Sequence, residues 1–211
     1  MNQALMDHMK HQRPTLALNG DWMLFRNPKV ATISMMGEGP LRESYVRFRA
    51  NQTKWLKVWD GLYRDRLDEV FKFTFVRNSW DRVASAFFFL LTRHVKKNRP
   101  KMKDGDGELF GKFIKGEFRH DWPNVNVHYR DQGSNFLFDG EVFVDFIGEF
   151  EHLVGDWGYV AGKLGVCKEL PHVNKGPKRK GYVEYYDSES IEIVGDIYRE
   201  EIDYMGYEFG K

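Results

Sequence analysis

Hydrophobic residues along the chain follow two periods in turn, one typical of β-strands and one typical of α-helices. The apolar runs 22–26 (WMLFR) and 71–76 (FKFTFV) are short and rich in aromatic or β-branched residues, as strands are. A third strand is expected within 141–151 (EVFVDFIGEFE). Each run is followed by a segment in which apolar residues recur every three or four positions. Strands that alternate with helices predict an α/β domain with three layers, in which helices flank a mainly parallel sheet.

Helical spacing extends over longer segments as well. Within 42–70, apolar residues lie three or four positions apart on one face, which we expect to pack on the sheet. Ser79 or Asp81 is expected to cap the helix after the second strand, because both residue types accept hydrogen bonds from the first N–H groups of a helix. The C-terminal segment has the same spacing, with Ser188 or Ser190 as its expected cap.

The length and composition of the chain limit its organisation. With 211 residues, of which 16% are aromatic, the chain is long enough for one well-packed domain, expected over 21–211 after an N-terminal extension, 1–20. Lysine and arginine number 32 and aspartate and glutamate 31, so no overall field favours nucleic acid or a membrane as a partner. No apolar stretch reaches the length of a signal-peptide core or a membrane span, so we expect a soluble, cytoplasmic protein.

Cysteine and histidine usage argues against a metal cofactor. The single cysteine, Cys167, excludes an internal disulfide and a metal site built from cysteines, and we expect it in the core. Neither an H-E-x-x-H segment nor histidines at ligand spacing occur in the sequence, so no metal is expected.

Arg77 follows the second strand at its carboxyl end, which is where α/β proteins bind their ligands. Its guanidinium presents a planar fork of N–H donors, and Ser85, on the helix that follows, adds a hydroxyl. Together they suit one phosphate group, with Arg82 and Ser79 as further candidates. An alternative stays open at this point: Arg77 pairs with an acid on a neighbouring loop, and Ser85 is a small residue for helix packing.

The first strand ends in a similar arrangement. The segment 28–34 (PKVATIS) places Lys29 and the hydroxyls of Thr32 and Ser34 at the expected start of a helix. Backbone N–H groups and the helix dipole favour an anion there, and Lys29 adds a positive charge. The segment lacks the glycines of a Walker A loop, which argues against a nucleoside triphosphate as ligand. A solvated lysine beside a capping threonine is the alternative.

Taken together, the segments 28–34 and 73–90 (FTFVRNSWDRVASAFFFL) closely resemble the carbohydrate-type sulfotransferases, sulfotransferase family 2. In that family a PKVACTS-like loop binds the 5′-phosphosulfate of 3′-phosphoadenosine 5′-phosphosulfate (PAPS), and an RNPxxRxxSxY segment binds its 3′-phosphate. Further segments are similar to family motifs in the same order: VHYRDQ, VDFIGEFEHL, PHVNKG and MGYEFG. The similarity extends over 26–209. It departs from the family pattern where Ile33 replaces a threonine and Ser79 replaces a proline.

The resemblance implies a fold related to the P-loop kinases and a role for each matching residue. Lys29, Thr32 and Ser34, with the neighbouring backbone, would hold the 5′-phosphosulfate, and Arg77 with Ser85 would hold the 3′-phosphate. A basic loop, NKGPKRKG, would either close over the nucleotide or remain solvated. The residues that the resemblance assigns to the donor are Pro28, Lys29, Val30, Ala31, Thr32, Ile33, Ser34, Arg77, Ser85, Lys178, Arg179 and Lys180.

Sulfuryl transfer needs positive charge on the transferring oxygens, which Lys29 would supply, and a base that takes the proton of the acceptor. Many relatives place a histidine or glutamate base between the two motifs, where this sequence has no histidine. The candidates are Glu38 and Glu43, if burial raises their pKa, and His128, whose side chain titrates near neutral pH. His94, after the second helix, is a further candidate. Each has an ordinary alternative as a solvated acid or a structural histidine.

These residues predict an enzyme that transfers a sulfuryl group from PAPS, its co-substrate, to a hydroxyl, expected on a carbohydrate. Neither nucleic acid nor a membrane is expected as a partner. Two alternatives remain at this level. One is a nucleotide or small-molecule kinase on the same fold, and the other is a catalytically idle module that binds a nucleotide or a glycan.

Overall fold

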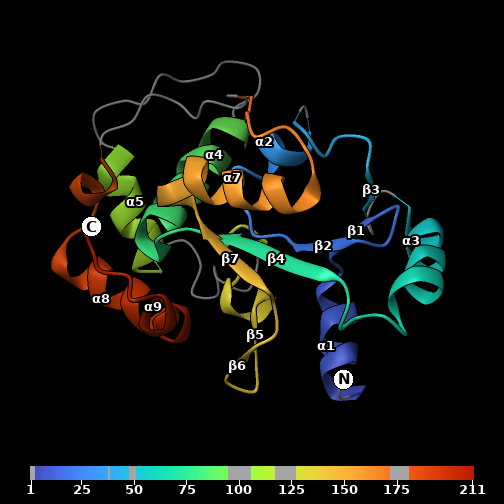
Figure 1. Ribbon diagram of the computed structural model, residues 1–211. Coiled ribbons are helices and arrows are strands. Elements are labelled where there is room, and N and C mark those ends of the chain that lie inside the picture. The colour runs from blue at the N-terminus through green and yellow to red at the C-terminus, as the bar shows by residue number, and fades with distance from the viewer. Residues whose placement is uncertain (1–2, 38, 48–50, 95–105, 117–126, 172–180) are drawn as a thin grey trace. The chain divides into compact units, whose positions relative to one another are not determined.

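The structure, a computed structural model, describes residues 3–37, 39–47, 51–94, 106–116, 127–171 and 181–211 (Figure 1). The chain forms two compact units, and each is built from two separate stretches. The first unit comprises Met1–Val76 and Gln132–Asn174, and the second comprises Arg77–Asp131 and Lys175–Lys211. The first is an α/β unit, and the described elements of the second are helices.

A five-stranded sheet in the order β3-β1-β2-β4-β7 forms the centre of the first unit. β4 pairs in parallel with β2 on one side and with β7 on the other, whereas β1 pairs antiparallel with β2 and β3. The expected α/β class is confirmed, but the sheet is mixed, because a short turn joins β1 to β2 and such a turn can only join antiparallel strands. The strands are β1 (Thr15–Ala17), β2 (Trp22–Phe25), β3 (Tyr45–Val46), β4 (Phe71–Val76) and β7 (Phe146–Glu149).

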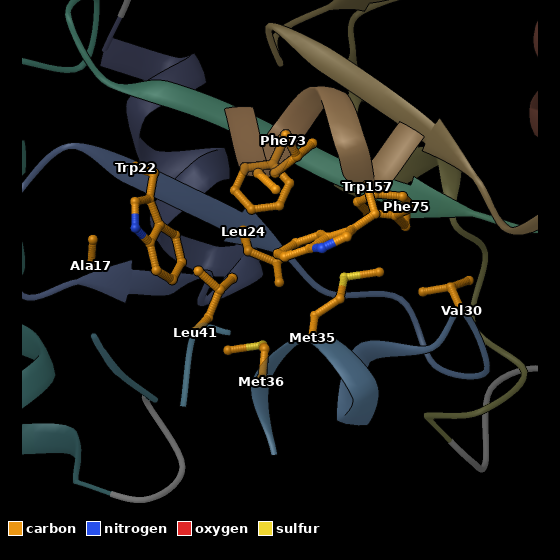
Figure 2. Close-up of a cluster of buried hydrophobic side chains, with 12 residues drawn as sticks. Ala17, Trp22, Leu24, Val30, Met35, Met36, Leu41, Phe73, Phe75 and Trp157 are labelled. Atoms are coloured by element: carbon orange, nitrogen blue, oxygen red, sulfur yellow. The ribbon is translucent and has the colours of Figure 1, made fainter. Parts of the chain in front are cut away.

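Helices cover both faces of this sheet (Figure 1). Successive side chains of a strand point to opposite faces, so Leu24 and Phe25 of β2 mark the two sides. Leu24 lies in a buried cluster with Trp157 of α7 and with residues of α2 (Figure 2). Phe25 packs edge-to-face on Phe143, whose ring contacts His8 of α1. The helices of this unit are α1 (Gln3–Gln12), α2 (Thr32–Met36), α3 (Gln52–Val58) and α7 (Leu153–Leu164).

Shorter elements complete the first unit. The π-helical turn η1 (Trp59–Tyr63) continues α3, and the 3₁₀ turn η3 (Phe150–His152) leads into α7. The 3₁₀ turn η2 (Gly133–Asn135) precedes a hairpin of β5 (Leu137–Phe138) and β6 (Glu141–Val142).

The face expected within 42–70 is the buried face of α3 and η1. Trp55, Trp59 and Tyr63 are all at most 1% exposed. The Tyr63 hydroxyl donates to the carbonyls of Ala17 and Trp22, each at 2.8 Å. The spacing therefore predicted the packing correctly, since these hydrogen bonds attach the helical segment to β1 and β2.

The second unit is built around α4 (Ser79–His94), the longest described helix of the chain. Its buried residues Val83 and Phe88 share a core with Phe110 of α5 and Val194 of α8. The remaining elements are α5 (Asp106–Ile114), the 3₁₀ turn η4 (Tyr182–Tyr185), α8 (Ser188–Ile197) and α9 (Arg199–Met205).

The helix caps differ from the expected ones. The Asn78 side-chain oxygen accepts from the N–H groups of Trp80 at 3.2 Å and Asp81 at 3.4 Å, so Asn78 caps α4. Ser79 and Asp81 lie inside the first turn, and their assignment as caps was wrong. Asp187 caps α8, and its carboxylate accepts from the N–H of Ser190 at 2.9 Å. Ser190 is the reciprocal partner in this capping box rather than the cap itself.

Two further expectations concern exposure. Cys167 is exposed rather than part of the core, because it follows the end of α7 on the surface; its carbonyl accepts a hydrogen bond from the Trp157 indole at 3.3 Å. Among the described residues, no helix has the length and apolar character needed to cross a membrane.

Candidate donor-binding site

The connection from β2 to α2 has an unusual backbone. Lys29 has φ 70° and Ala31 has φ 60°, both in the left-handed region that non-glycine residues rarely adopt. Val30, between them, lies outside that region. Left-handed residues in a loop can turn neighbouring N–H groups toward one side, which is one way in which concave anion sites form. The loop Pro28–Ala31 is therefore a candidate anion site, although it contains no glycine.

Tertiary contacts hold this conformation, which costs about 1–2 kcal/mol for each left-handed residue. Val30 is 1% exposed and lies at the border of the buried cluster of the first unit (Figure 2). The Thr32 hydroxyl donates to the carbonyl of Asn27 at 3.0 Å and so closes the loop. The carbonyl of Ala31 accepts from the N–H groups of Ser34 at 2.8 Å and Met35 at 3.2 Å, which begins α2.

The side chains that the resemblance assigns to this loop have different surroundings. Lys29 is half-buried, Ser34 is 8% exposed and Ile33 is 51% exposed. Thr32 uses its hydroxyl proton within the protein, on the carbonyl of Asn27. The Thr32 hydroxyl therefore helps to hold the loop closed, and the contacts of Lys29, Thr32 and Ser34 with the donor stay predictions.

Arg77 directly follows β4 in the chain and begins the second unit. It is 7% exposed, and its Nη1 donates to the Ser85 hydroxyl at 3.3 Å. Its Nε and Nη2 donate to one carboxylate oxygen of Asp81, at 2.8 and 2.5 Å. The structure thus brings Arg77 and Ser85 together. Arg77 also forms an ion pair, but its partner Asp81 lies on α4, the helix of Ser85, rather than on a neighbouring loop. Arg77 precedes α4, and its spacing of four positions from Asp81, itself four positions before Ser85, brings it over the helix face that carries these two residues.

Arg82 and Ser79, the further phosphate candidates, belong instead to a buried network of the second unit. Arg82 is 0% exposed and donates from Nη1 to the carbonyls of His128 and Arg130, at 3.1 and 2.9 Å. Its Nη2 donates to Glu201 of α9 at 3.3 Å, and the Ser79 hydroxyl donates to the same carboxylate oxygen at 2.5 Å. Ser79, where the family pattern has proline, therefore adds a hydroxyl contact that proline could not make.

The candidate bases are found in different places. His128 is half-buried, and its ring centroid lies 5.1 Å from that of Phe89. Glu43 is exposed on the turn before β3. His94 ends α4, and its side chain lies outside the described part of the structure. The remaining candidates, the base Glu38 and the basic-loop residues Lys178, Arg179 and Lys180, lie outside the described residues.

A carboxylate at the carboxyl edge of the sheet was not among the residues predicted from the sequence. Glu149 ends β7 and pairs with Val76, the last residue of β4. Since β2, β4 and β7 are parallel, their carboxyl ends lie at the same edge. Burial raises the pKa of the Glu149 carboxyl, and the nearby acids Glu151 and Asp156 act in the same direction. The signal that could have found it was its place at the end of a parallel strand.

No three histidine, cysteine, aspartate or glutamate side chains lie close enough together to hold a metal ion in the described part of the chain. The donor groups found there are N–H groups, hydroxyls and cationic side chains, which bind anions. The fold defines the protein as an α/β protein, and the segments after β2 and β4 are its candidate anion sites.

Comparison with known families identifies the chain more closely. A model described as the sulfotransferase family, family 2, matches residues 15–208, so the chain belongs to this sulfotransferase family. Comparisons with curated proteins and with solved structures gave no match. Family membership makes the protein a transferase and implies a sulfuryl donor and a hydroxyl-bearing acceptor.

Proposed function

We propose that this protein transfers a sulfuryl group from PAPS to a hydroxyl of a carbohydrate acceptor in the cytoplasm, on a fold related to the P-loop kinases. The observation that carries the proposal is the left-handed backbone of Lys29 and Ala31 ahead of α2, in a chain that belongs to a sulfotransferase family. Strained residues of this kind cluster at functional sites, where the strain serves the geometry of binding. The carbohydrate class of the acceptor rests on the resemblance to carbohydrate-type relatives.

Each of the two segments, taken by itself, has donor groups of the kind that bind an anionic group of PAPS. The N–H groups of the Pro28–Ala31 loop and Lys29 suit the 5′-phosphosulfate, and Arg77 with Ser85 suits the 3′-phosphate. When bound, PAPS supplies the sulfuryl group and leaves as adenosine 3′,5′-bisphosphate. Lys29 would stabilise the negative charge that develops on the leaving phosphate, which is where a fixed cation lowers the barrier.

A base must accept the proton of the attacking hydroxyl. We keep Glu38, Glu43 and His128 as its candidates. A base that works near neutral pH needs a pKa close to that range, which a histidine has by nature and a glutamate acquires by burial. Glu43 is exposed, so it lacks the burial that this role demands, whereas His128 is half-buried against an aromatic ring.

Nucleotide binding to an Arg77→Ala variant tests the donor assignment. We expect the wild type to bind adenosine 3′,5′-bisphosphate more tightly than adenosine 5′-phosphate in calorimetry. Arg77→Ala should lose about 1.5–3 kcal/mol of this preference, the contribution of a hydrogen bond to a charged group. Release of adenosine 3′,5′-bisphosphate from PAPS in the presence of a carbohydrate then tests turnover.

Arg199→Ala is the matched control, because Arg199 belongs to the same unit and forms an exposed ion pair with Asp196. It should keep the preference of the wild type. Equal binding of the two nucleotides by the wild type would refute the PAPS assignment. Binding without turnover would indicate an idle nucleotide-binding module.

A further inference from the structure

Asn27, the residue just before the Pro28–Ala31 loop, has a buried side chain that joins three parts of the first unit. It is 2% exposed. Its side-chain nitrogen donates to the Thr74 hydroxyl at 3.2 Å and to the Phe75 carbonyl at 2.9 Å. Its side-chain oxygen accepts from the side-chain nitrogen of Asn135 at 2.8 Å. Both ends of the amide therefore have partners, as buried polar groups require.

These partners come from β4 and from η2, so they fix the end of β2 against two neighbouring elements. The Thr74 hydroxyl in turn donates to the carbonyl of Phe25, the last residue of β2, at 2.7 Å. The position at which the loop leaves the sheet is thus set by side chains from three separate stretches of chain. None of these hydrogen bonds involves Lys29 or another side chain proposed to contact the donor.

The backbone of Asn27 also fixes the other end of the loop, because its carbonyl accepts from the Thr32 hydroxyl. The four residues Pro28–Ala31 therefore form a loop whose two ends are both held by Asn27. Left-handed conformations at non-glycine residues persist only where the surroundings leave the chain no relaxed alternative. A loop of this length with both ends fixed meets that condition at Lys29 and Ala31.

We propose that Asn27 is a positioning residue for the 5′-phosphosulfate group of the donor, and that it acts through the conformation of the Pro28–Ala31 loop. The proposal rests on the proposed function, since it concerns the same site. A Walker A loop obtains its backbone freedom from glycine, whereas the Pro28–Ala31 loop contains no glycine and is held in its strained conformation by the hydrogen bonds of a buried amide. Asn27 itself does not touch the donor.

The affinities of three nucleotides distinguish the contributions of the 5′-phosphate and the 3′-phosphate to binding. The affinity ratio of adenosine 3′,5′-bisphosphate to adenosine 3′-phosphate reports the contribution of the 5′-phosphate. The ratio of adenosine 3′,5′-bisphosphate to adenosine 5′-phosphate reports that of the 3′-phosphate. We expect Asn27→Leu, which keeps the size of the side chain and removes its hydrogen bonds, to lower the first ratio about tenfold and to leave the second unchanged. Arg77→Ala should give the opposite pattern.

A second variant guards against misfolding. Asn135→Ala removes one of the three side-chain hydrogen bonds of Asn27 from a distant segment and should lower the first ratio about threefold. Tyr63→Phe is the control, because it removes buried hydrogen bonds near the other end of β2 and should leave both ratios unchanged. Calorimetry is done below the unfolding temperature of every variant.

The outcomes are distinguishable. If the wild type shows no contribution from either phosphate, the proposed function itself fails. If the wild type shows both contributions and the two asparagine variants keep them, the positioning role of Asn27 is overturned while the proposed function stands. A similar decrease of both affinity ratios in these variants would also overturn the positioning role of Asn27. That result would indicate that the whole site is loosened rather than the loop alone.

Discussion

The side chains of the candidate site show how far a residue type alone predicts a role. Arg77 and Ser85 were expected to meet, and they do, at 3.3 Å. The carboxylate of Asp81 was expected to cap a helix and instead orients the guanidinium of Arg77. The Thr32 hydroxyl donates to the carbonyl of Asn27, and its contact with the donor stays a prediction. Hydroxyls and carboxylates have many possible partners, so their sequence position fixes the neighbourhood and not the contact.

Neither left-handed residue of the loop could be predicted from the sequence. Positive φ values are expected at glycine, and the loop has a lysine and an alanine at these positions. Their conformation depends on Asn27, whose partners lie far away along the chain. Long-range hydrogen bonds of this kind have no signature in a single sequence.

The raised pKa of Glu149 predicts a pH-dependent effect on stability. A carboxyl whose pKa is higher in the folded than in the unfolded protein costs stability once the pH rises through its unfolded value, about 4.3, toward its folded value. Glu149→Gln should therefore raise the melting temperature at pH 7 by no more than ~2 °C, since solvent screens this partly exposed group. The gain should vanish at pH values below both pKa values.

Melting curves of wild type and Glu149→Gln between pH 3.5 and 8, values chosen to bracket the usual glutamate pKa of about 4.3, give the measurement. Glu141→Gln is the control, because Glu141 is an exposed acid of the same unit and is not among the groups that shift the pKa of Glu149. A gain for Glu149→Gln that is the same at every pH would contradict the prediction, since it would come from the amide rather than from the loss of a titrating group.

At the scale of elements, long periodic segments were predicted well and short ones were not. The strands at 22–26 and 71–76, the helical face within 42–70 and the helix after His152 all have counterparts. β1 and β3, with three and two residues, were missed because so few positions show no period. The helix α1 was missed because its segment is polar and buries only Met9.

The close pairing of β4 with β7 depends on Gly148. A Cβ atom at this position would lie 2.4 Å from the ring of Phe75, which is 1% exposed and has no room to move. Gly148→Ala should therefore lower the free energy of unfolding by about 1–3 kcal/mol, the usual cost of overpacking a core. Urea denaturation measures the change.

Gly158→Ala provides the matched control. Gly158 lies inside α7, and a Cβ atom there would meet nothing within 4 Å. Because alanine favours the helix over glycine, this variant should gain about 0.5–1 kcal/mol. Two glycine-to-alanine changes in one unit would thus have opposite signs, and a loss in both would show that the Phe75 contact is not the cause.

On the scale of the whole molecule, a buried ion pair links two helices of the second unit. Arg82 and Glu201 have side chains that are 0% and 2% exposed, and they link α4 to α9. Removing one partner of such a pair leaves the other charge buried and uncompensated, which costs about 3–5 kcal/mol. We expect Glu201→Gln to lose this amount in urea denaturation, whereas Glu200→Gln, at the adjacent exposed position, should change stability by less than about 0.5 kcal/mol.

An unchanged stability in Glu201→Gln would mean that the amide, with the Ser79 hydroxyl, compensates Arg82 fully. The sequence offered no sign of this pair, because its members lie 119 positions apart. It did identify Arg82, but as a phosphate ligand. The charge of Arg82 is buried against α9, a helix that is distant in the sequence. The local motif around Arg82 could therefore not predict its pairing with Glu201.

Both units are assembled from two stretches of chain that alternate in the sequence, with boundaries at Val76, Asp131 and Asn174. A ribosome that has released β4 has not yet made β7, its parallel neighbour, and α4 emerges long before α8 and α9. Such delayed pairing slows folding, because the chain must close large loops first. No single cut yields either unit intact. Neither unit can therefore be excised, or exchanged between relatives, as one continuous segment of the chain.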